Sequence, residues 1–130
     1  MASPRKAFHS QTAPKAIGPY SQAVRIASGP IFLSGQIPLD PTTGQLVEGD
    51  IVAQTERVME NLRNVLEAAG CTFEHVVRCG IFLVDLNDFA KVNEVYGRHF
   101  AENPPARSTV QVTALPKGAR VEIDAIAVVL

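Results

Sequence analysis

Residues 51–69 read IVAQTERVMENLRNVLEAA and carry the clearest structural signal in the chain. Apolar side chains recur here at intervals of seven, as from Val58 to Val65, which is typical of one face of an α-helix. Asp50 can accept a hydrogen bond from a free N–H at the helix start, and Gly70 can adopt the left-handed conformation that ends a helix. The sequence therefore predicts a helix over residues 51–69.

A second helix is predicted over residues 88–101, with Asn87 as its N-cap and Pro104 and Pro105 beyond its end. Its inner face would consist of Phe89, Val92, Tyr96 and Phe100. Asn93 falls at the edge of that face, where an amide commonly bonds to a neighbouring loop.

Strands are predicted over residues 23–27, 31–34, 76–84, 109–114 and 120–130. A tight hairpin at residues 28–30 would join the first two. Residues 40–44 read DPTTG, which is typical of a turn, and residues 46–47 would form a short extended segment. The order β-β-(β)-α-β-α-β-β indicates an α+β fold with two layers, a mixed sheet and two helices on one face.

Two helices of about 10 Å each can cover only one face of a sheet that is about 24 Å wide. However, the strand at residues 76–84 and the chain end at residues 125–130 are apolar on both faces. Something must cover the second face. We therefore expect a symmetric homo-oligomer whose sheets pack together.

The 130 residues, 46% of them hydrophobic, are expected to form one domain over residues 1–130, with residues 1–12 as a flexible N-terminal tail. The net charge of −1 gives no general attraction to nucleic acid or to anionic membranes. Residues 1–12 also lack the apolar core of a secretory signal, so the expected compartment is the cytoplasm.

Several chemistries lack sequence support. The sequence contains neither G-x-G-x-x-G nor a P-loop motif, and neither G-x-S-x-G nor H-E-x-x-H. Cys71, Cys79 and the three histidines lack metal-ligand spacing, so no metal site is expected.

Arg107 is a candidate ligand-binding residue because the rigid segment Pro104–Pro105 precedes it. A guanidinium can hold a carboxylate through two parallel hydrogen bonds. The alternative is an ordinary surface arginine in a loop.

Glu122 is a candidate general base. It shares a strand face with Asp124 and with the apolar Ile126, so its carboxylate is expected to be half-buried, with a raised pKa suited to activating water. The alternative is a carboxylate that faces solvent on a strand.

Several short motifs occur together: GPYSQA at 18–23, SGQI at 34–37, PARS at 105–108, LPKG at 115–118 and VEIDAIA at 121–127. With these motifs the chain resembles the Rid (reactive intermediate deaminase) family, also called YjgF, over residues 13–129. The resemblance implies a chorismate-mutase-like α+β subunit in a homotrimer, with clefts between subunits. It also implies hydrolysis of 2-iminobutanoate and 2-iminopropanoate to 2-keto acids and ammonia, without a cofactor.

The same resemblance implies roles for individual residues. Arg107 would hold the substrate carboxylate, Glu122 would position the attacking water, and Tyr20 would form a wall of the pocket. Further cleft positions would be Ser34, Gly35, Asn93 and Thr109.

Two positions differ from the usual family pattern. Thr109 stands where well-known relatives carry cysteine, so any role of a thiol is lost, whereas a contact through the backbone N–H would be kept. Pro104 stands where relatives often carry an aromatic residue.

Two other functions remain open: a non-catalytic carboxylate-binding or chaperone-like module, and an endoribonuclease or translation inhibitor, which the charge of −1 disfavours.

Overall fold

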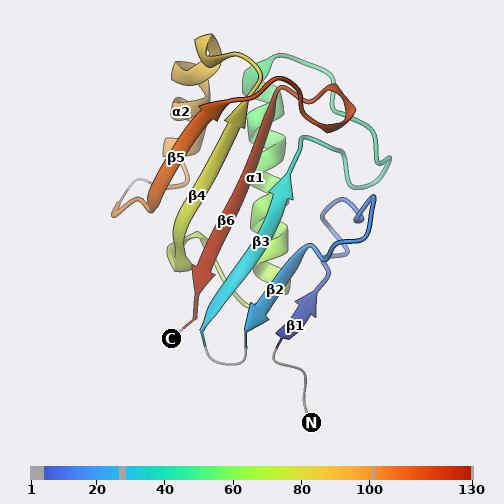
Figure 1. Ribbon diagram of the computed structural model, residues 1–130, viewed down its shortest axis with the longest axis vertical. Coiled ribbons are helices and arrows are strands. Elements are labelled where there is room, and N and C mark those ends of the chain that lie inside the picture. Colours follow the sequence, from blue (N-terminus) through green and yellow to red (C-terminus); the bar gives the residue numbers. More distant parts are fainter. Residues whose placement is uncertain (1–4, 27–28, 101, 130) are drawn as a thin grey trace.

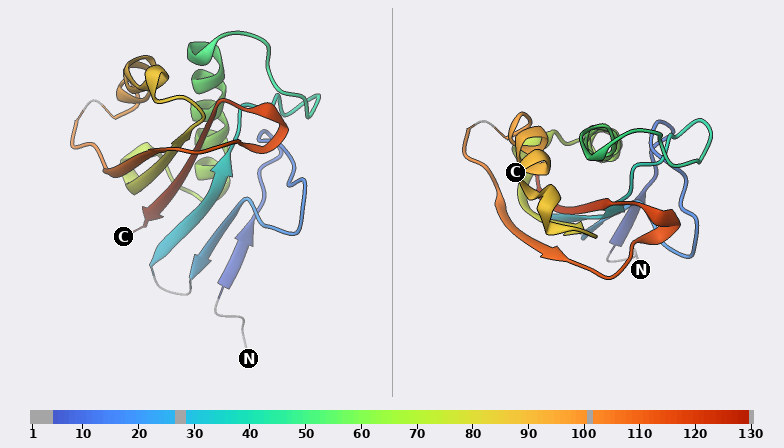
Figure 2. Two further views of the ribbon diagram at one scale, coloured as in Figure 1. Left: turned by 45° about the horizontal axis from the view of Figure 1, so that its top comes forward. Right: turned by 90° about the horizontal axis from the view of Figure 1, so that it is seen from above.

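The computed structural model describes residues 5–26, 29–100 and 102–129. They form a six-stranded sheet with two α-helices on one face (Figures 1 and 2). The strands are β1 Arg5–Phe8, β2 Ala23–Ile26, β3 Pro30–Gln36, β4 Val76–Leu83, β5 Ala106–Gln111 and β6 Val121–Val128. The helices are α1 Ile51–Ala68 and α2 Phe89–Gly97, and the 3-10 turns are η1 Phe73–His75, η2 Leu86–Asp88 and η3 Pro116–Gly118.

The strand order is β1-β2-β3-β6-β4-β5. Neighbouring strands are antiparallel except for β4 and β5, which are parallel because the chain returns through α2 between them. This confirms the predicted α+β class, the mixed sheet and the two helices on one face. In the part of the chain that the structure describes, no helix has the length and apolar character needed to cross a membrane.

Helix α1 begins and ends much as predicted. The side chain of Asp50 accepts a hydrogen bond of 3.0 Å from the N–H of Ala53. Gly70, just beyond the helix, has a φ of 78°, which a residue without a side chain adopts easily. The buried side chains of α1 pack on the sheet and include Val58, Met59, Leu62, Val65 and Leu66.

Helix α2 is shorter than the predicted 88–101, and Asn87 is not its N-cap. The side chain of Asp85 accepts a hydrogen bond of 2.9 Å from the N–H of Asn87 and thereby caps the turn η2, which leads directly into the helix. At the other end, the N–H of His99 bonds to the carbonyl of Tyr96, so the last residues form a tighter turn.

Within the segment 1–12, for which the sequence predicts a flexible tail, residues 5–8 form β1 and pair with β2; residues 1–4 lie outside the described residues. A strand this short, with only one large apolar residue, shows no alternation of apolar and polar residues that would identify it in the sequence. Residues 46–47 form no strand, and Leu46 makes only an isolated bridge with Leu39. The predicted turn is present: the N–H of Gly44 bonds to the carbonyl of Asp40 at 2.8 Å.

Strand β5 begins at Ala106, three residues earlier than predicted, because its register pairs Ala106 with Arg78. The predicted strand at 120–130 is β6, which ends at Val128. Antiparallel pairing of β2 with β3 agrees with the predicted hairpin, although residues 27 and 28 lie outside the described residues.

Strand β6 lies in the middle of the sheet, and its two faces lie in different environments. Its buried residues face the helices, and they are Val121, Ile123, Ala125 and Ala127. The alternate residues are half-buried on the other face, and they are Glu122, Asp124, Ile126 and Val128.

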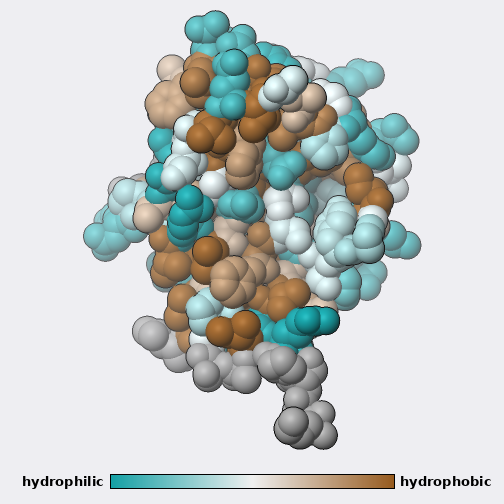
Figure 3. Space-filling view, viewed as in Figure 1, coloured by the Kyte–Doolittle hydropathy of each residue, from teal (hydrophilic) through white to brown (hydrophobic). Residues whose placement is uncertain are grey.

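The face without helices carries exposed apolar side chains, as expected from the sequence. Phe32 is 46% exposed, Val77 is 48% exposed and Val110 is 45% exposed. Figure 3 shows hydrophobic side chains spread over this face, with polar ones between them. We call it the open face.

Candidate functional site

Arg107 lies on β5 and points toward α2. Its guanidinium carbon is 5.0 Å from the centre of the Tyr96 ring and 5.5 Å from that of Phe89. Among the described residues, this guanidinium makes no hydrogen bond and no ion pair. Its N–H groups are therefore available to an anionic ligand.

Three polar atoms near Arg107 are buried without a hydrogen-bond partner among the described residues: Oδ1 of Asn93, the hydroxyl of Tyr96 and Oγ1 of Thr109. Asn93 lies between Phe89 and Tyr96 on one helix face, and Thr109 follows Arg107 on the same face of β5. A buried unsatisfied polar group typically costs about 1–3 kcal/mol, so three in one place indicate a functional site. We call Phe89, Asn93, Tyr96, Arg107 and Thr109 the Arg107 half-site.

The thiol of Cys79 lies beside the hydroxyl of Tyr96, although the two do not have the geometry of a full hydrogen bond. Burial raises the pKa of the Cys79 thiol to about 11, and burial also raises the pKa of Tyr96. Both groups are therefore neutral at neutral pH and do not cancel the charge of Arg107.

Glu122 lies in a second place, a pocket of about 310 Å³. The pocket is lined by Ile17, Tyr20, Ser34, Gly35, Ile37, Pro116 and Glu122, which we call the Glu122 half-site. Burial raises the pKa of the Glu122 carboxyl, and the nearby carboxylate of Asp124 raises it further. A carboxylate with a raised pKa is a stronger base than an exposed one.

Local contacts shape the Glu122 half-site. The hydroxyl of Ser34 donates a hydrogen bond of 2.6 Å to the carbonyl of Ser21, and the hydroxyl of Tyr20 accepts one of 3.3 Å from the N–H of Ile17. The carboxylate of Glu122 lies directly against Gly35, in the space that a side chain there would fill. The absence of a side chain at Gly35 therefore leaves the space that the carboxylate occupies.

Asp124 also lies against a glycine, and a hydrogen bond holds its carboxylate there. Its Oδ1 accepts a hydrogen bond of 2.8 Å from the N–H of Gly80, and a Cβ at position 80 would lie 2.6 Å from that oxygen. The negative charge of Asp124 is thus held on the same face of β6 as Glu122.

The contact between Gly35 and Glu122 leads to a prediction. We expect Gly35→Ala to displace the Glu122 carboxylate and to reduce any activity that depends on it by at least about tenfold, because small misplacements of a catalytic group are costly. Gly97→Ala is the matched control, since a side chain at Gly97 meets no atom within 4 Å. Steady-state rates at equal folded fraction, checked by circular dichroism, test this, and equal rates for both variants would contradict it.

The two half-sites lie on opposite faces of the sheet. Arg107 pairs with Cys79, and Cys79 pairs with Ala125, so this row faces the helices. Glu122 pairs with Phe82, three residues further along β4 than Cys79. Because successive residues of a strand point to alternate faces, Glu122 belongs to the open face. A single chain therefore does not bring Arg107 and Glu122 together.

In the structure, the candidate site residues from the sequence form two groups. Tyr20, Ser34, Gly35 and Glu122 lie together, and so do Asn93, Arg107 and Thr109.

Other residues of the half-sites were missed or misread. The sequence predicts Tyr96 and Phe89 only as residues of a helix core. Ile37 and Pro116 occur in the quoted motifs without an assigned role, and Ile17 is not singled out. The spacing of seven between Phe89 and Tyr96 is a signal that both rings share a face. Only the pairing of β5 with β4 places Arg107 against that face.

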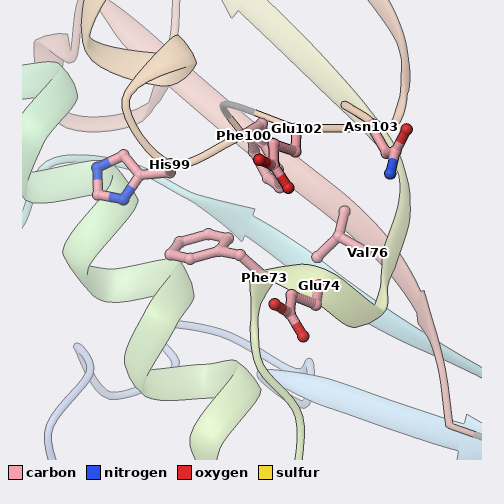
Figure 4. Close-up of a pocket in the computed structure, with 7 residues that line it drawn as sticks. All are labelled: Phe73, Glu74, Val76, His99, Phe100, Glu102 and Asn103. Carbon is pink, nitrogen blue, oxygen red and sulfur yellow. The ribbon is translucent and has the colours of Figure 1, made fainter.

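A third hollow, of about 330 Å³, lies between the start of β4 and the segment after α2 (Figure 4). It is lined by Phe73, Glu74, Val76, His99, Phe100, Glu102 and Asn103. Burial and the nearby Arg63 lower the pKa of His99, so this lining has two carboxylates and no cation at neutral pH. It is therefore unsuited to a carboxylate ligand.

Comparison with protein families shows that residues 10–129 match the model described as Endoribonuclease L-PSP. Among curated proteins, the chain is 70% identical to Protein DfrA of Myxococcus xanthus, over 95% of both chains. It is 51% identical to the 2-iminobutanoate/2-iminopropanoate deaminase of Mus musculus, over 95% of this chain and 91% of the mouse protein.

Solved structures show the same fold. A putative endoribonuclease from Thermotoga maritima has a TM-score of 0.92 and 50% identity, covering 96% of this chain and 98% of its own. TdcF of E. coli, solved with bound serine, has a TM-score of 0.90 and 43% identity, covering 96% of this chain and 99% of its own.

Proposed function

The chain belongs to the Rid/YjgF/L-PSP family, and on this premise we propose that it hydrolyses 2-imino acids such as 2-iminobutanoate and 2-iminopropanoate to 2-keto acids and ammonia. The observation that carries the proposal is the 51% identity to the mouse deaminase over 95% of this chain. The geometry of the two half-sites supports the roles of individual residues.

Arg107 is the group that would bind the substrate carboxylate. Its guanidinium is half-buried, makes no ion pair with a described residue and lies against two rings that limit its movement. A planar carboxylate can take two parallel hydrogen bonds from it. The serine in the related E. coli structure is a small molecule with such a carboxylate.

Glu122 is the group that would direct water. A protonated imine is already electrophilic, so the site needs mainly orientation and a base. Glu122 would take a proton from water as the water oxygen bonds to the imine carbon, which gives a tetrahedral carbinolamine. Glu122 would return this proton to the nitrogen. The carbon–nitrogen bond then breaks as the hydroxyl proton passes to the departing ammonia, which leaves the 2-keto acid and ammonium. These steps use no redox change.

We place the complete site between two copies of the chain. The two half-sites face opposite sides of one sheet, so a bound imine would reach both Arg107 and Glu122 only if a neighbouring copy supplied one of them. The exposed apolar side chains of the open face supply a surface for such packing. A homotrimer, with three equivalent clefts, is the assembly that we propose.

A substitution that introduces a charge on the open face tests the proposed homotrimer. We expect Phe32→Asp to yield monomers and to abolish imine hydrolysis, because Phe32 is 46% exposed and an interface would bury the new carboxylate without a partner. Ala68→Asp adds the same charge on the exposed side of α1 and should leave the assembly intact. Sedimentation equilibrium measures both, and a wild-type monomer at micromolar concentration would contradict the assembly.

The activity itself is tested with imine that a threonine dehydratase generates in the assay. We expect purified protein to speed the loss of imine, followed as reduced formation of the semicarbazone in trapping experiments. No effect at micromolar enzyme would exclude the deaminase. Binding of a 2-keto acid without any turnover would instead support a carboxylate-binding module.

The description of the family model favours a second candidate, an endoribonuclease. A net charge of −1 weakens it, because RNA binding depends mainly on cationic contacts to phosphate. RNA binding with a steep dependence on salt, together with RNA cleavage, would support this candidate.

A further inference from the structure

The guanidinium of Arg107 lies against two aromatic rings. With no hydrogen bond or ion pair from the described residues, its guanidinium is held by its contacts with Tyr96 at 5.0 Å and Phe89 at 5.5 Å. A cation is attracted to the face of an aromatic ring, and a planar guanidinium can also stack on it. These two rings are therefore the neighbours that could limit the orientation of the Arg107 N–H groups.

The two rings differ in rigidity. Tyr96 is only 5% exposed, whereas Phe89 is 37% exposed. The Tyr96 ring packs on Phe100, with 4.7 Å between ring centres, and Phe100 in turn packs edge-on against Phe73 at 5.2 Å. Tyr96 is thus part of the core, and its ring is the fixed surface under the guanidinium.

The hydroxyl group does not account for the presence of a tyrosine at position 96. It is buried and lacks a hydrogen-bond partner among the described residues, so it adds little to the stability of the core. Besides its packing on Phe100, the Tyr96 ring contacts the guanidinium of Arg107.

We propose that Tyr96 is a positioning residue for Arg107: its buried ring holds the guanidinium in the plane in which two N–H groups can meet a carboxylate. The carboxylate part of this inference rests on the proposed function. Tyr96 itself need not touch the substrate, since it acts through Arg107.

Two substitutions test the contributions of the Tyr96 ring and of its hydroxyl separately. Tyr96→Leu removes the ring but keeps an apolar side chain in the core, and we expect it to weaken the binding of 2-oxobutanoate about tenfold, with a similar rise in KM. Tyr96→Phe keeps the ring and should restore binding close to the wild-type value. If Tyr96→Leu fails to fold, Tyr96→Met fills the same space with a flexible chain and replaces it.

A double-mutant cycle tests whether Tyr96 acts through Arg107. In protein that already carries Arg107→Ala, Tyr96→Leu should cause no further loss of 2-oxobutanoate binding by calorimetry. A general structural role would instead lower binding equally in both backgrounds, and that result would overturn the proposal.

Crystal structures of the ligand-free wild type and of both Tyr96 variants give a readout that does not depend on activity. We expect a displaced or disordered Arg107 guanidinium in Tyr96→Leu and an unchanged one in Tyr96→Phe. An unchanged guanidinium in Tyr96→Leu, or equal losses of binding in both variants, would overturn the proposal. If the guanidinium moves but the wild type neither binds 2-oxobutanoate nor hydrolyses imines, the positioning role stands and the proposed function fails.

Discussion

Replacing Arg107 by alanine should reduce kcat/KM for imine hydrolysis at least about a hundredfold, since a charge-assisted bidentate contact contributes a few kcal/mol. The fold should persist, because Arg107 forms no ion pair with the described residues and lies at the edge strand β5. Stopped assays with dehydratase-generated imine measure the change, and thermal unfolding checks the fold.

The matched control is Arg98→Ala. Arg98 is an exposed arginine that pairs with Glu56 and Glu94 and is not a residue of either half-site. Its loss should leave kcat/KM close to the wild-type value. Unaltered kinetics in Arg107→Ala would refute the role of Arg107 in binding the carboxylate.

Glu122→Gln is the second substitution with a large expected effect. The amide has nearly the shape of the carboxylate but is a far weaker base, so we expect kcat to fall by about two to four orders of magnitude. KM should change much less, since the carboxylate contact to Arg107 remains. Activity near that of the wild type would mean that Glu122 does not direct the water.

The pH dependence follows from the raised pKa of Glu122. Burial, and then the charge of Asp124, favours the protonated form, so activity should decline as the pH falls through a value above that of an ordinary glutamate. Asp124→Asn removes the neighbouring charge and can still accept the hydrogen bond from Gly80, so it should move this acid limb to lower pH. An acid limb that stays in place in Asp124→Asn would contradict this electrostatic link.

The same pKa shift has a consequence for stability. The folded protein binds the Glu122 proton more tightly than the unfolded chain does. The free energy of unfolding should therefore fall as the pH rises from the ordinary glutamate pKa through the raised one. Glu122→Gln should lack this step, and at neutral pH it should be at least as stable as the wild type.

Much of the fold could be predicted from local patterns. Helix α1 has a cap at Asp50, a stop at Gly70 and a regular apolar period, and each of these is a property of neighbouring residues. The errors lie where pairing with distant strands decides the structure. Strand β1 exists because β2 offers it an edge, and β5 begins at Ala106 because β4 sets its register.

The site was predictable only in part for the same reason. The family motifs indicated Tyr20, Gly35, Arg107 and Glu122, but a motif does not show on which face of a sheet a residue lies. The rows of paired residues place Arg107 with the helices and Glu122 on the open face. The role inferred for Tyr96 likewise needed the contact between its ring and Arg107.

Mixing two inactive variants is the most direct test of a site that two copies share. Arg107→Ala and Glu122→Gln protein, unfolded together and refolded as mixed trimers, should regain activity. In random trimers about one quarter of the clefts would combine an intact Arg107 with an intact Glu122, so about one quarter of wild-type activity should return. Mixed assemblies that stay inactive, with subunit exchange verified by mass spectrometry, would show that the two residues do not meet between copies.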